Sequence, residues 1–210
     1  MGWPATDRYE LPHAPGGLGL VQDVLNTRSI QQPRMPDLLA DLEDAQSWVD
    51  GVVGAWSLET GLRQERVPLR EADLDRLRDL RVDLNTLVGH GDQNHGGPIL
   101  PSSSVSARLA PDGRVVLEPR GEGSRRVGAM VLIEMFTAQS LDTWRRLKVC
   151  RNDRCRVSFY DRSRNNSGVW HDARVCGNAI NLRASRARKR ERELGVAQPA
   201  RQAVESGDHS

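Results

Sequence analysis

All three cysteines of this 210-residue chain lie within 27 residues, at Cys150, Cys155 and Cys176. His171 stands between the last two, so the segment has the spacing C-x4-C-x15-H-x4-C. Three thiolates and one imidazole are a sufficient tetrahedral ligand set for zinc, and both pairs have spacings that are usual in structural sites. We therefore predict one structural zinc ion (Zn2+) bound by these four side chains.

Residues 148–176 contain few apolar side chains besides the ligands, so zinc binding would supply the folding free energy that a small core cannot. The alternative is that the cysteines are small buried hydrophobic residues and that His171 is incidental. Their clustering in one polar, glycine-containing stretch favours zinc. A catalytic zinc keeps one coordination position open, so a fourth protein ligand favours a structural ion.

The chain is strongly basic around and after these residues. From Arg145 to Arg192 it carries 15 Lys+Arg and four acidic residues, a net charge of +11, although the whole chain has a formal charge of only +2. Such a local concentration of positive charge attracts polyanions. The alternative is a solvated basic face without a partner, but its position directly after a metal site favours nucleic acid.

We predict that a basic helix after Gly177 contacts duplex DNA. Arginine suits guanine edges and phosphates, and asparagine suits adenine, so reading bases and binding phosphates both stay open for the helix residues. Two arginines in the preceding loop are expected to bind backbone phosphates. The candidate nucleic-acid-binding residues are Arg162, Arg164, Asn178, Asn181, Arg183, Arg186, Arg188, Lys189 and Arg190.

The chain before the cysteines is acidic, and its apolar residues mostly recur at regular spacings. Residues 1–16 are rich in proline and glycine and predict an irregular lead-in, and Gly51–Arg70 is ambiguous. Alternation over 104–120, interrupted by Pro111-Asp112-Gly113, predicts a β-hairpin. Apolar spacing predicts four helices, over 18–25, from Pro36 to about 49, over 74–88, and over 126–147.

These elements predict an α+β fold in three parts. Residues 1–147 form a mainly helical domain with a β-hairpin, and residues 148–194 form a small zinc finger that ends in the basic helix. Residues 195–210 form a disordered tail.

The segment from Val149 to Asn178 resembles the CGNR zinc-finger family of bacteria. The resemblance rests on the C-x4-C pair, on Phe159-Tyr-Asp-Arg-Ser-Arg-Asn165, on a tryptophan near the third ligand, and on Cys176-Gly-Asn. It implies a stress-linked transcription regulator. It also implies an N-terminal domain of the ABATE type, whose "VNT" helix is similar to Leu20–Thr27 and whose hairpin-then-helix order matches.

The sequence departs from that family pattern at two positions. His171 stands where the family has cysteine, a change that zinc tolerates and that alters the charge of the site from −2 to −1. Ala179 stands where the family has its name-giving arginine, so any contact made by that arginine is missing.

The leading hypothesis is a DNA-binding transcriptional regulator with a regulatory, sensor-like N-terminal domain. The alternative is a zinc-stabilised interaction module that binds RNA or an acidic protein; the scarcity of aromatic residues for base stacking disfavours single-stranded RNA. A homodimer fits a short finger that offers a small DNA interface. A small-molecule effector is expected beside the helix that ends in Asn26 and Thr27, although these residues fit a helix-capping or packing role equally well.

We do not expect an enzyme. The only other gathering of metal-ligand residue types is the glycine-rich loop from His90 to His95, and no nucleophile–base pair or phosphate-binding motif accompanies it. No apolar run is long enough to span a membrane, and no apolar signal segment opens the chain. The expected location is therefore the cytoplasm, at the nucleoid when bound to DNA.

Overall fold

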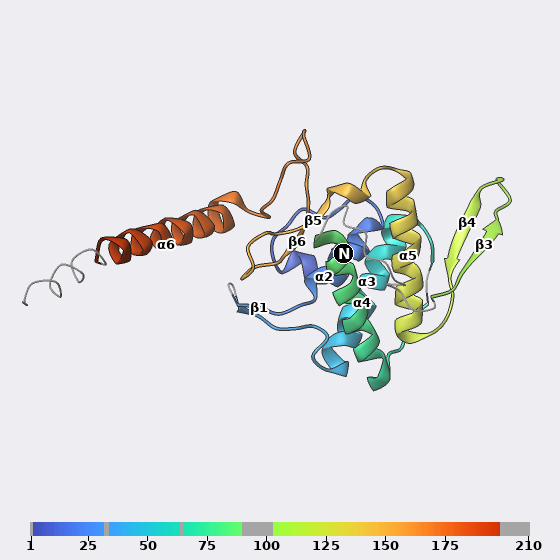
Figure 1. Ribbon diagram of the computed structural model, residues 1–210. Coiled ribbons are helices and arrows are strands. Elements are labelled where there is room, and N and C mark those ends of the chain that lie inside the picture. The colour runs from blue at the N-terminus through green and yellow to red at the C-terminus, as the bar shows by residue number, and fades with distance from the viewer. Residues whose placement is uncertain (1, 32–33, 64, 90–102, 198–210) are drawn as a thin grey trace, which may run out of the picture. The chain divides into compact units, whose positions relative to one another are not determined.

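A computed structural model of the chain describes residues 2–31, 34–63, 65–89 and 103–197 (Figure 1). Two compact units divide between His171 and Asp172, that is, inside the predicted finger. The α+β fold class is confirmed. The helices of the first unit are α1 (Pro4–Asp7), α2 (Leu18–Asn26), α3 (Leu42–Thr60), α4 (Glu71–Gly89) and α5 (Gly123–Ser140), followed by a 3-10 turn, η1 (Trp144–Arg146).

The strands of the first unit form three antiparallel pairs. They are β1 (Ile30–Gln31) with β2 (Arg34–Met35), β3 (Val105–Leu109) with β4 (Val115–Pro119), and β5 (Leu147–Val149) with β6 (Ser158–Tyr160). The β3–β4 hairpin is the one that the sequence predicts, and Figure 1 shows it projecting beside α5.

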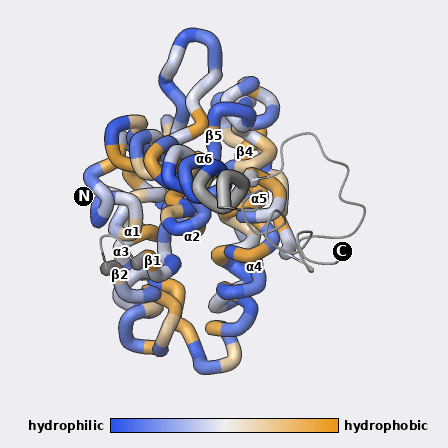
Figure 2. The backbone as a smooth tube through the Cα atoms, turned by 60° about the vertical axis from the view of Figure 1, so that its left-hand side comes forward, coloured by the Kyte–Doolittle hydropathy of each residue, from blue (hydrophilic) through white to orange (hydrophobic). Residues whose placement is uncertain are grey.

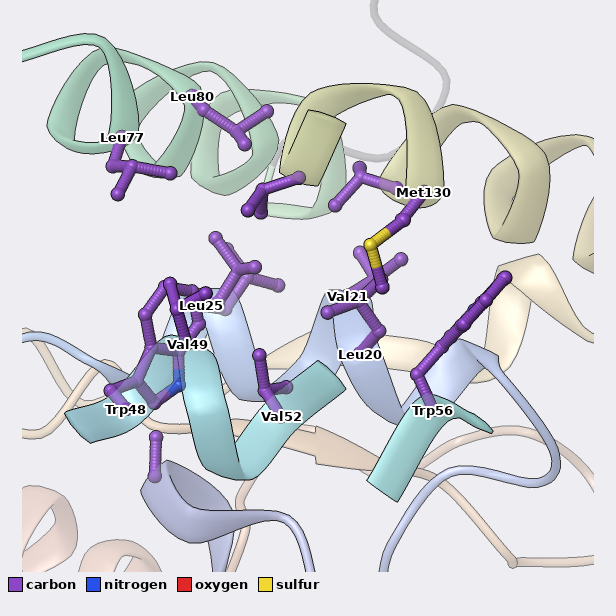
Figure 3. Close-up of a cluster of buried hydrophobic side chains, with 14 of the residues drawn as sticks. Leu20, Val21, Leu25, Trp48, Val49, Val52, Trp56, Leu77, Leu80 and Met130 are labelled. Carbon is purple, nitrogen blue, oxygen red and sulfur yellow. The ribbon is translucent and has the colours of Figure 1, made fainter. Parts of the chain in front are cut away.

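The core of the first unit is built around α2, every residue of which is buried. In Figure 3, α2 lies between α3 on one side and α4 with α5 on the other. Leu77 and Met130 point toward α2 from that second side, and Trp56 extends from α3 toward α5, where its Nε1 donates to Glu134 Oε1 at 2.7 Å. Because α2 has no solvent-facing side, its polar residues need protein partners for their hydrogen bonds.

Asp23 of α2 fastens the N-terminal residues to this core. Its carboxylate accepts hydrogen bonds from the backbone N–H groups of Ala5 (3.2 Å) and Thr6 (2.7 Å) and from Trp48 Nε1 (2.8 Å). The prediction of an irregular lead-in over residues 1–16 was therefore partly wrong, because α1 lies within it and Trp3 is buried. The cost of burying this carboxylate in α2 is offset because it accepts hydrogen bonds from N–H groups that the start of α1 leaves unpaired.

The helix predicted from Pro36 begins instead at Leu42. Asp41 is its N-cap: its side chain accepts from Asp44 N at 2.9 Å, and its extended backbone stops the helix from starting earlier. The helix ends at Gly61, whose φ of 71° is the left-handed conformation that glycine adopts freely. The ambiguous stretch after Gly51 is thus helical up to Thr60.

Asp73 explains where α4 and α5 begin. It accepts from Arg70 N (2.9 Å) at the start of α4, and from Ser124 N (3.0 Å) and Oγ (2.6 Å) at the start of α5. One carboxylate therefore serves two helix N-termini, where the helix dipoles favour negative charge. The predicted helix over 74–88 is confirmed, with Leu74, Leu77, Leu80 and Leu84 buried.

The predicted helix over 126–147 is too long at its C-terminal end, because α5 stops at Ser140. Asp142 then takes a φ of 55°, and the chain passes through η1 into β5. This break sets β5 beside β6 instead of continuing the helix to the first cysteine. No helix among the described residues is long and apolar enough to span a membrane.

The second unit holds one π-helical turn, η2 (Ala173–Gly177), and α6 (Asn178–Ala197). Figure 2 shows α6 mostly in the hydrophilic colour. The predicted tail, 195–210, lies outside the described residues from 198 onward, and so does the loop that contains His90 and His95.

Candidate metal centre

The β5–β6 pair that carries the first two cysteines is joined to the helical core through Asn26. Asn26 Oδ1 accepts from Ser158 N at 2.8 Å, and Asn26 Nδ2 donates to Ser158 O at 3.0 Å. The amide side chain therefore pairs with the free edge of β6 as a neighbouring strand would. Asn26 Nδ2 also donates to Thr6 Oγ1 (3.2 Å), so all of these groups are satisfied in a buried place.

A tight turn brings Cys150 and Cys155 together after β5. Cys150 N donates to Val157 O at 2.9 Å, which extends the ladder by one bond. Asn152 O accepts from Cys155 N (2.7 Å) and from Arg156 N (3.0 Å). Arg156 has a φ of 58°, a conformation that is uncommon for a residue with a side chain and that closes the turn.

The loop that leads to His171 is organised by Asp161. Its carboxylate accepts from Lys148 Nζ (2.7 Å), Ser163 N (2.9 Å) and Gly168 N (2.7 Å), although its side chain is only 4% exposed. Lys148 Nζ also donates to Asn166 O (2.6 Å) and Gly168 O (3.1 Å). Burial alone would raise the pKa of Asp161, but the Lys148 ammonium and the donors from Ser163 and Gly168 hold it well below its usual value.

The fourth ligand, Cys176, belongs to the second unit and is positioned by hydrogen bonds to neighbouring residues. Asp172 is the N-cap of the π-helical turn, and its Oδ1 accepts from Arg174 N (2.7 Å) and Val175 N (3.0 Å). Cys176 N donates to Asp172 O at 2.9 Å, so the thiol is fixed one turn after the cap. Gly177 follows, and α6 starts at Asn178.

The ligand atoms of Cys150, Cys155, His171 and Cys176 lie within 4.8 Å of one another. The three cysteines are buried and His171 is half-buried. Tetrahedral zinc with sulfur at about 2.3 Å and nitrogen at about 2.0–2.1 Å needs its ligands about this close. Cys155 Sγ and His171 Nδ1 are 3.3 Å apart, a separation that fits two donors of one ion. The predicted ligand set is therefore confirmed as a cluster that accommodates one zinc ion.

The thiol of Cys150 is also shifted toward the form that binds metal. The pKa of Cys150 lies well below its usual value because the side chain of Cys155 donates a hydrogen bond to it; burial opposes this, and His171 adds to it. The thiolate is the metal-binding form of cysteine, so this environment favours zinc over a neutral thiol core. In Zn2+ coordination the His171 imidazole would contribute Nδ1, the atom that faces Cys155.

The predicted nucleic-acid residues fall in both units. Arg162 is exposed and donates to His13 O at 2.9 Å, and Arg164 is exposed on the same loop. On α6, Arg183 is half-buried and donates from Nε to Ala179 O at 3.3 Å. The exposed candidates on α6 are Asn178, Asn181, Arg186, Arg188, Lys189 and Arg190.

Sequence reasoning missed the residues that support the site. Asn26 was a candidate only for capping or a ligand pocket, whereas it binds a strand 132 positions later. Asp161 lies within the family-like motif, but the sequence indicates no role for it. Both are polar residues that directly follow a largely apolar one, a signal that is compatible with a buried hydrogen-bonding role but does not name the partner.

Replacing Asp161 by Asn is expected to destabilise the full chain by about 2 kcal/mol at pH 7, because the amide keeps one acceptor oxygen and loses the charge beside Lys148. A carboxyl whose folded pKa is depressed contributes stability above its unfolded pKa, near 3.9, and loses it as the pH falls through the folded value. The stability difference between wild type and variant should therefore be constant from pH 8 to pH 5 and shrink below about pH 4. Urea unfolding across this range measures it; a difference that changes between pH 8 and pH 6 would contradict the assignment.

Comparison with protein-family models gives one match: residues 146–189 match the CGNR zinc finger. The matched segment begins before β5 and ends in α6, and it contains all four ligands. The resemblance that the sequence motifs suggest is therefore confirmed for this segment, while the ABATE-type N-terminal domain is not shown. No curated protein gave a significant match to the chain.

Proposed function

Since residues 146–189 match the CGNR zinc finger, we propose that the chain is a DNA-binding transcriptional regulator whose zinc site holds the start of a basic helix. The observation that carries the proposal is the position of α6. The helix begins one glycine after the last metal ligand, Cys176, and most of its cations are exposed. A metal-anchored helix with clustered arginines offers duplex phosphates an ordered row of donors.

The spacing of the α6 cations supports contact along one strip of the helix. Arg183, Arg186 and Arg190 follow one another at intervals of three and four residues, and Lys189 lies beside them. Residues three and four apart lie on the same helix face. Asn178 and Asn181 precede this strip at the N-terminal end, where short side chains can approach base edges.

The proposed role is binding and not catalysis. With four protein ligands the zinc ion has no open position for a water molecule or a substrate. The zinc ion supplies folding free energy and a rigid crosslink, and the protein groups around it hold the cysteines and His171 in place. The proposal includes the cytoplasm as the location, with the nucleoid when the chain is bound to DNA.

A homodimer is also part of the proposal, because a single short finger with one helix offers DNA less contact area than regulators of high affinity use. The N-terminal unit would supply the dimer contacts and the response to an effector. Sedimentation equilibrium of the full chain, alone and with duplex DNA, measures both stoichiometries.

Replacing Arg186 and Arg190 together by Gln is expected to weaken binding to all duplex sequences. It should also lower the slope of log affinity against log salt by about two, because each phosphate contact contributes about one counterion. Fluorescence anisotropy at several salt concentrations gives this slope. A matched loss of two charges on the β-hairpin, Arg108→Gln with Arg114→Gln, should leave the slope as in the wild type.

The same assay distinguishes the alternative function. If the chain binds RNA more tightly than duplex DNA of equal length, or binds neither at low salt while it holds zinc, the interaction-module hypothesis replaces the DNA-binding proposal. An unchanged salt slope in the Arg186→Gln, Arg190→Gln variant would also contradict the DNA-binding proposal.

A further inference from the structure

A hollow of about 270 Å³ lies where the end of α2 faces α4. This volume lies just below the usual range of about 300–1,000 Å³ for drug-sized pockets, and it suits a small ligand. Its lining is polar apart from one valine. The lining residues are Arg28, Ser29, Asp37, Arg81, Val82, Asn85 and Thr86.

The charges around this hollow do not balance. Asp37 is the one carboxylate of the lining, and Arg81 already binds both of its oxygens, at 2.7 Å and 2.9 Å. This pair is half-buried, and although burial opposes ionisation, the Arg81 hydrogen bonds hold the pKa of Asp37 below its usual value. Asp37 is therefore ionised and committed to Arg81, and it offers little to a second cation.

Arg28 is the second cation, and its guanidinium has no hydrogen bond or ion pair to any residue that the structure describes. The hydrogen bond that Arg28 does make involves its backbone and not its guanidinium: its carbonyl oxygen accepts from Tyr9 Oη at 3.2 Å. Burial lowers the pKa of Arg28, and the nearby charges of Arg156 and Arg81 lower it further. A half-buried guanidinium beside two others is unfavourable without an anion.

Arg156 brings the metal-binding turn to the edge of this hollow, because it contacts the lining residue Asn85. It directly follows the ligand Cys155, and its Nη2 donates to Asn85 Oδ1 at 2.8 Å. Asn85 is uncharged, so this bond positions Arg156 without neutralising it. Among the described residues, Arg28 and Arg156 thus form two neighbouring guanidiniums without an ion pair of their own, one just after α2 and one just after the ligand Cys155.

We propose that this hollow binds a small oxyanion, whose phosphate or carboxylate oxygens take hydrogen bonds from Arg28 and Arg156. A planar guanidinium binds two oxygens of such a group at once, which distinguishes arginine from lysine at these sites. Ser29 and Asn85 line the same hollow and add uncharged donors. The anion would be the effector of the N-terminal unit, and this inference does not depend on DNA binding.

An anion held here would connect the turn that carries the ligand Cys155 with two segments that contain no metal ligand. The end of α2, the middle of α4 and the turn after Cys155 would each contribute to the same ligand. Since a ligand that binds only the folded state stabilises it, occupancy should raise the stability of the unit that includes the first two cysteines.

The test is isothermal titration of the zinc-loaded full chain with inorganic phosphate and, separately, with succinate, against sodium chloride of equal ionic strength. We expect one saturable site for at least one of the two probes, and a rise of the melting temperature that follows its occupancy. Binding of phosphate alone would assign a phosphate ligand, and binding of succinate alone would assign a carboxylate.

Arg28→Gln should weaken this binding by about tenfold or more, because it removes a charged donor. Arg76→Gln is the matched control: it removes one exposed arginine from α4 outside the hollow, and it should bind the probe as the wild type does. Circular dichroism of both variants in chloride checks their folding. Absence of saturable binding for both probes, or equal binding by Arg28→Gln and wild type, would overturn the proposal, whereas the DNA assay above is unaffected by either result.

Discussion

Replacing Cys155 by Ser is expected to weaken zinc binding by roughly two to three orders of magnitude. The free energy of zinc binding in small structural sites is about 10–16 kcal/mol, and one of four ligands accounts for about a quarter of it. Serine cannot replace the thiolate, because its hydroxyl stays protonated at neutral pH. The variant also loses the sulfur that lies 3.3 Å from His171 Nδ1.

The effect should be confined to the region that zinc organises. The core around α2 is built from α3, α4 and α5 and does not depend on the metal, so far-UV circular dichroism should show that most of the helix content is kept. DNA binding should fall together with zinc content. Arg154→Ser is the control, since Arg154 is exposed in the same turn and is not a ligand. A Cys155→Ser variant that keeps stoichiometric zinc through dialysis against a weak chelator would contradict the ligand assignment.

Replacing Asn26 by Ala is the second change with a large expected effect. It removes both hydrogen bonds to the backbone of Ser158, which leaves the buried N–H without an acceptor and the buried C=O with only the long bond from Gln22 Nε2, at 3.5 Å. Each such group costs about 1–3 kcal/mol, so the chain should lose about 2–5 kcal/mol of stability. Denaturant unfolding of the full chain measures this loss.

A second readout distinguishes this role from general core packing. Hydrogen exchange at the Ser158 amide should become much faster in Asn26→Ala, because this N–H has the Asn26 oxygen as its acceptor. Asn181→Ala, an exposed position of α6, should change neither the stability nor this exchange rate. A loss below about 0.5 kcal/mol with unchanged Ser158 exchange would show that the amide pair is unimportant.

The parts of the structure that the sequence predicts are those whose signals are local. Four ligands within 27 residues define a metal site by spacing alone, and the recurring leucines of α4 define a helix. The hairpin follows from alternation around Pro111-Asp112-Gly113, where Gly113 adopts a φ of 84°. In each case the interactions that fix the element lie within a few residues of one another.

The predictions from sequence fail where a distant residue, or a weak signal at the end of a helix, determines where an element begins or ends. Pro36 is compatible with a helix start, but Asp41 is the residue whose side chain caps α3. The end of α5 at Ser140 is marked by no glycine or proline, and the chain turns at Asp142 instead. The lead-in is ordered through Asp23, a partner 17 or 18 residues away that no local pattern reveals.

The support of the metal site could not be predicted for the same reason. Asn26 and Ser158 are 132 residues apart, and Arg156 and Asn85 are 71 apart. Both contacts join the turn and strands around Cys150 and Cys155 to helices of the N-terminal part. The first compact unit accordingly includes the first three ligands, whereas the sequence pattern suggests a boundary at residue 147. The first part of the finger is thus packed on the helical core, and an isolated finger would lack these contacts.

The central claim is that Cys150, Cys155, His171 and Cys176 hold one zinc ion, and the most direct measurement is the metal content of the purified full chain by elemental analysis. The account predicts one zinc per chain, retained through dialysis at neutral pH. A chain that is folded, reduced and free of zinc after purification in zinc-containing buffer would contradict it, because the four side chains would then form a buried thiol cluster and not a metal site.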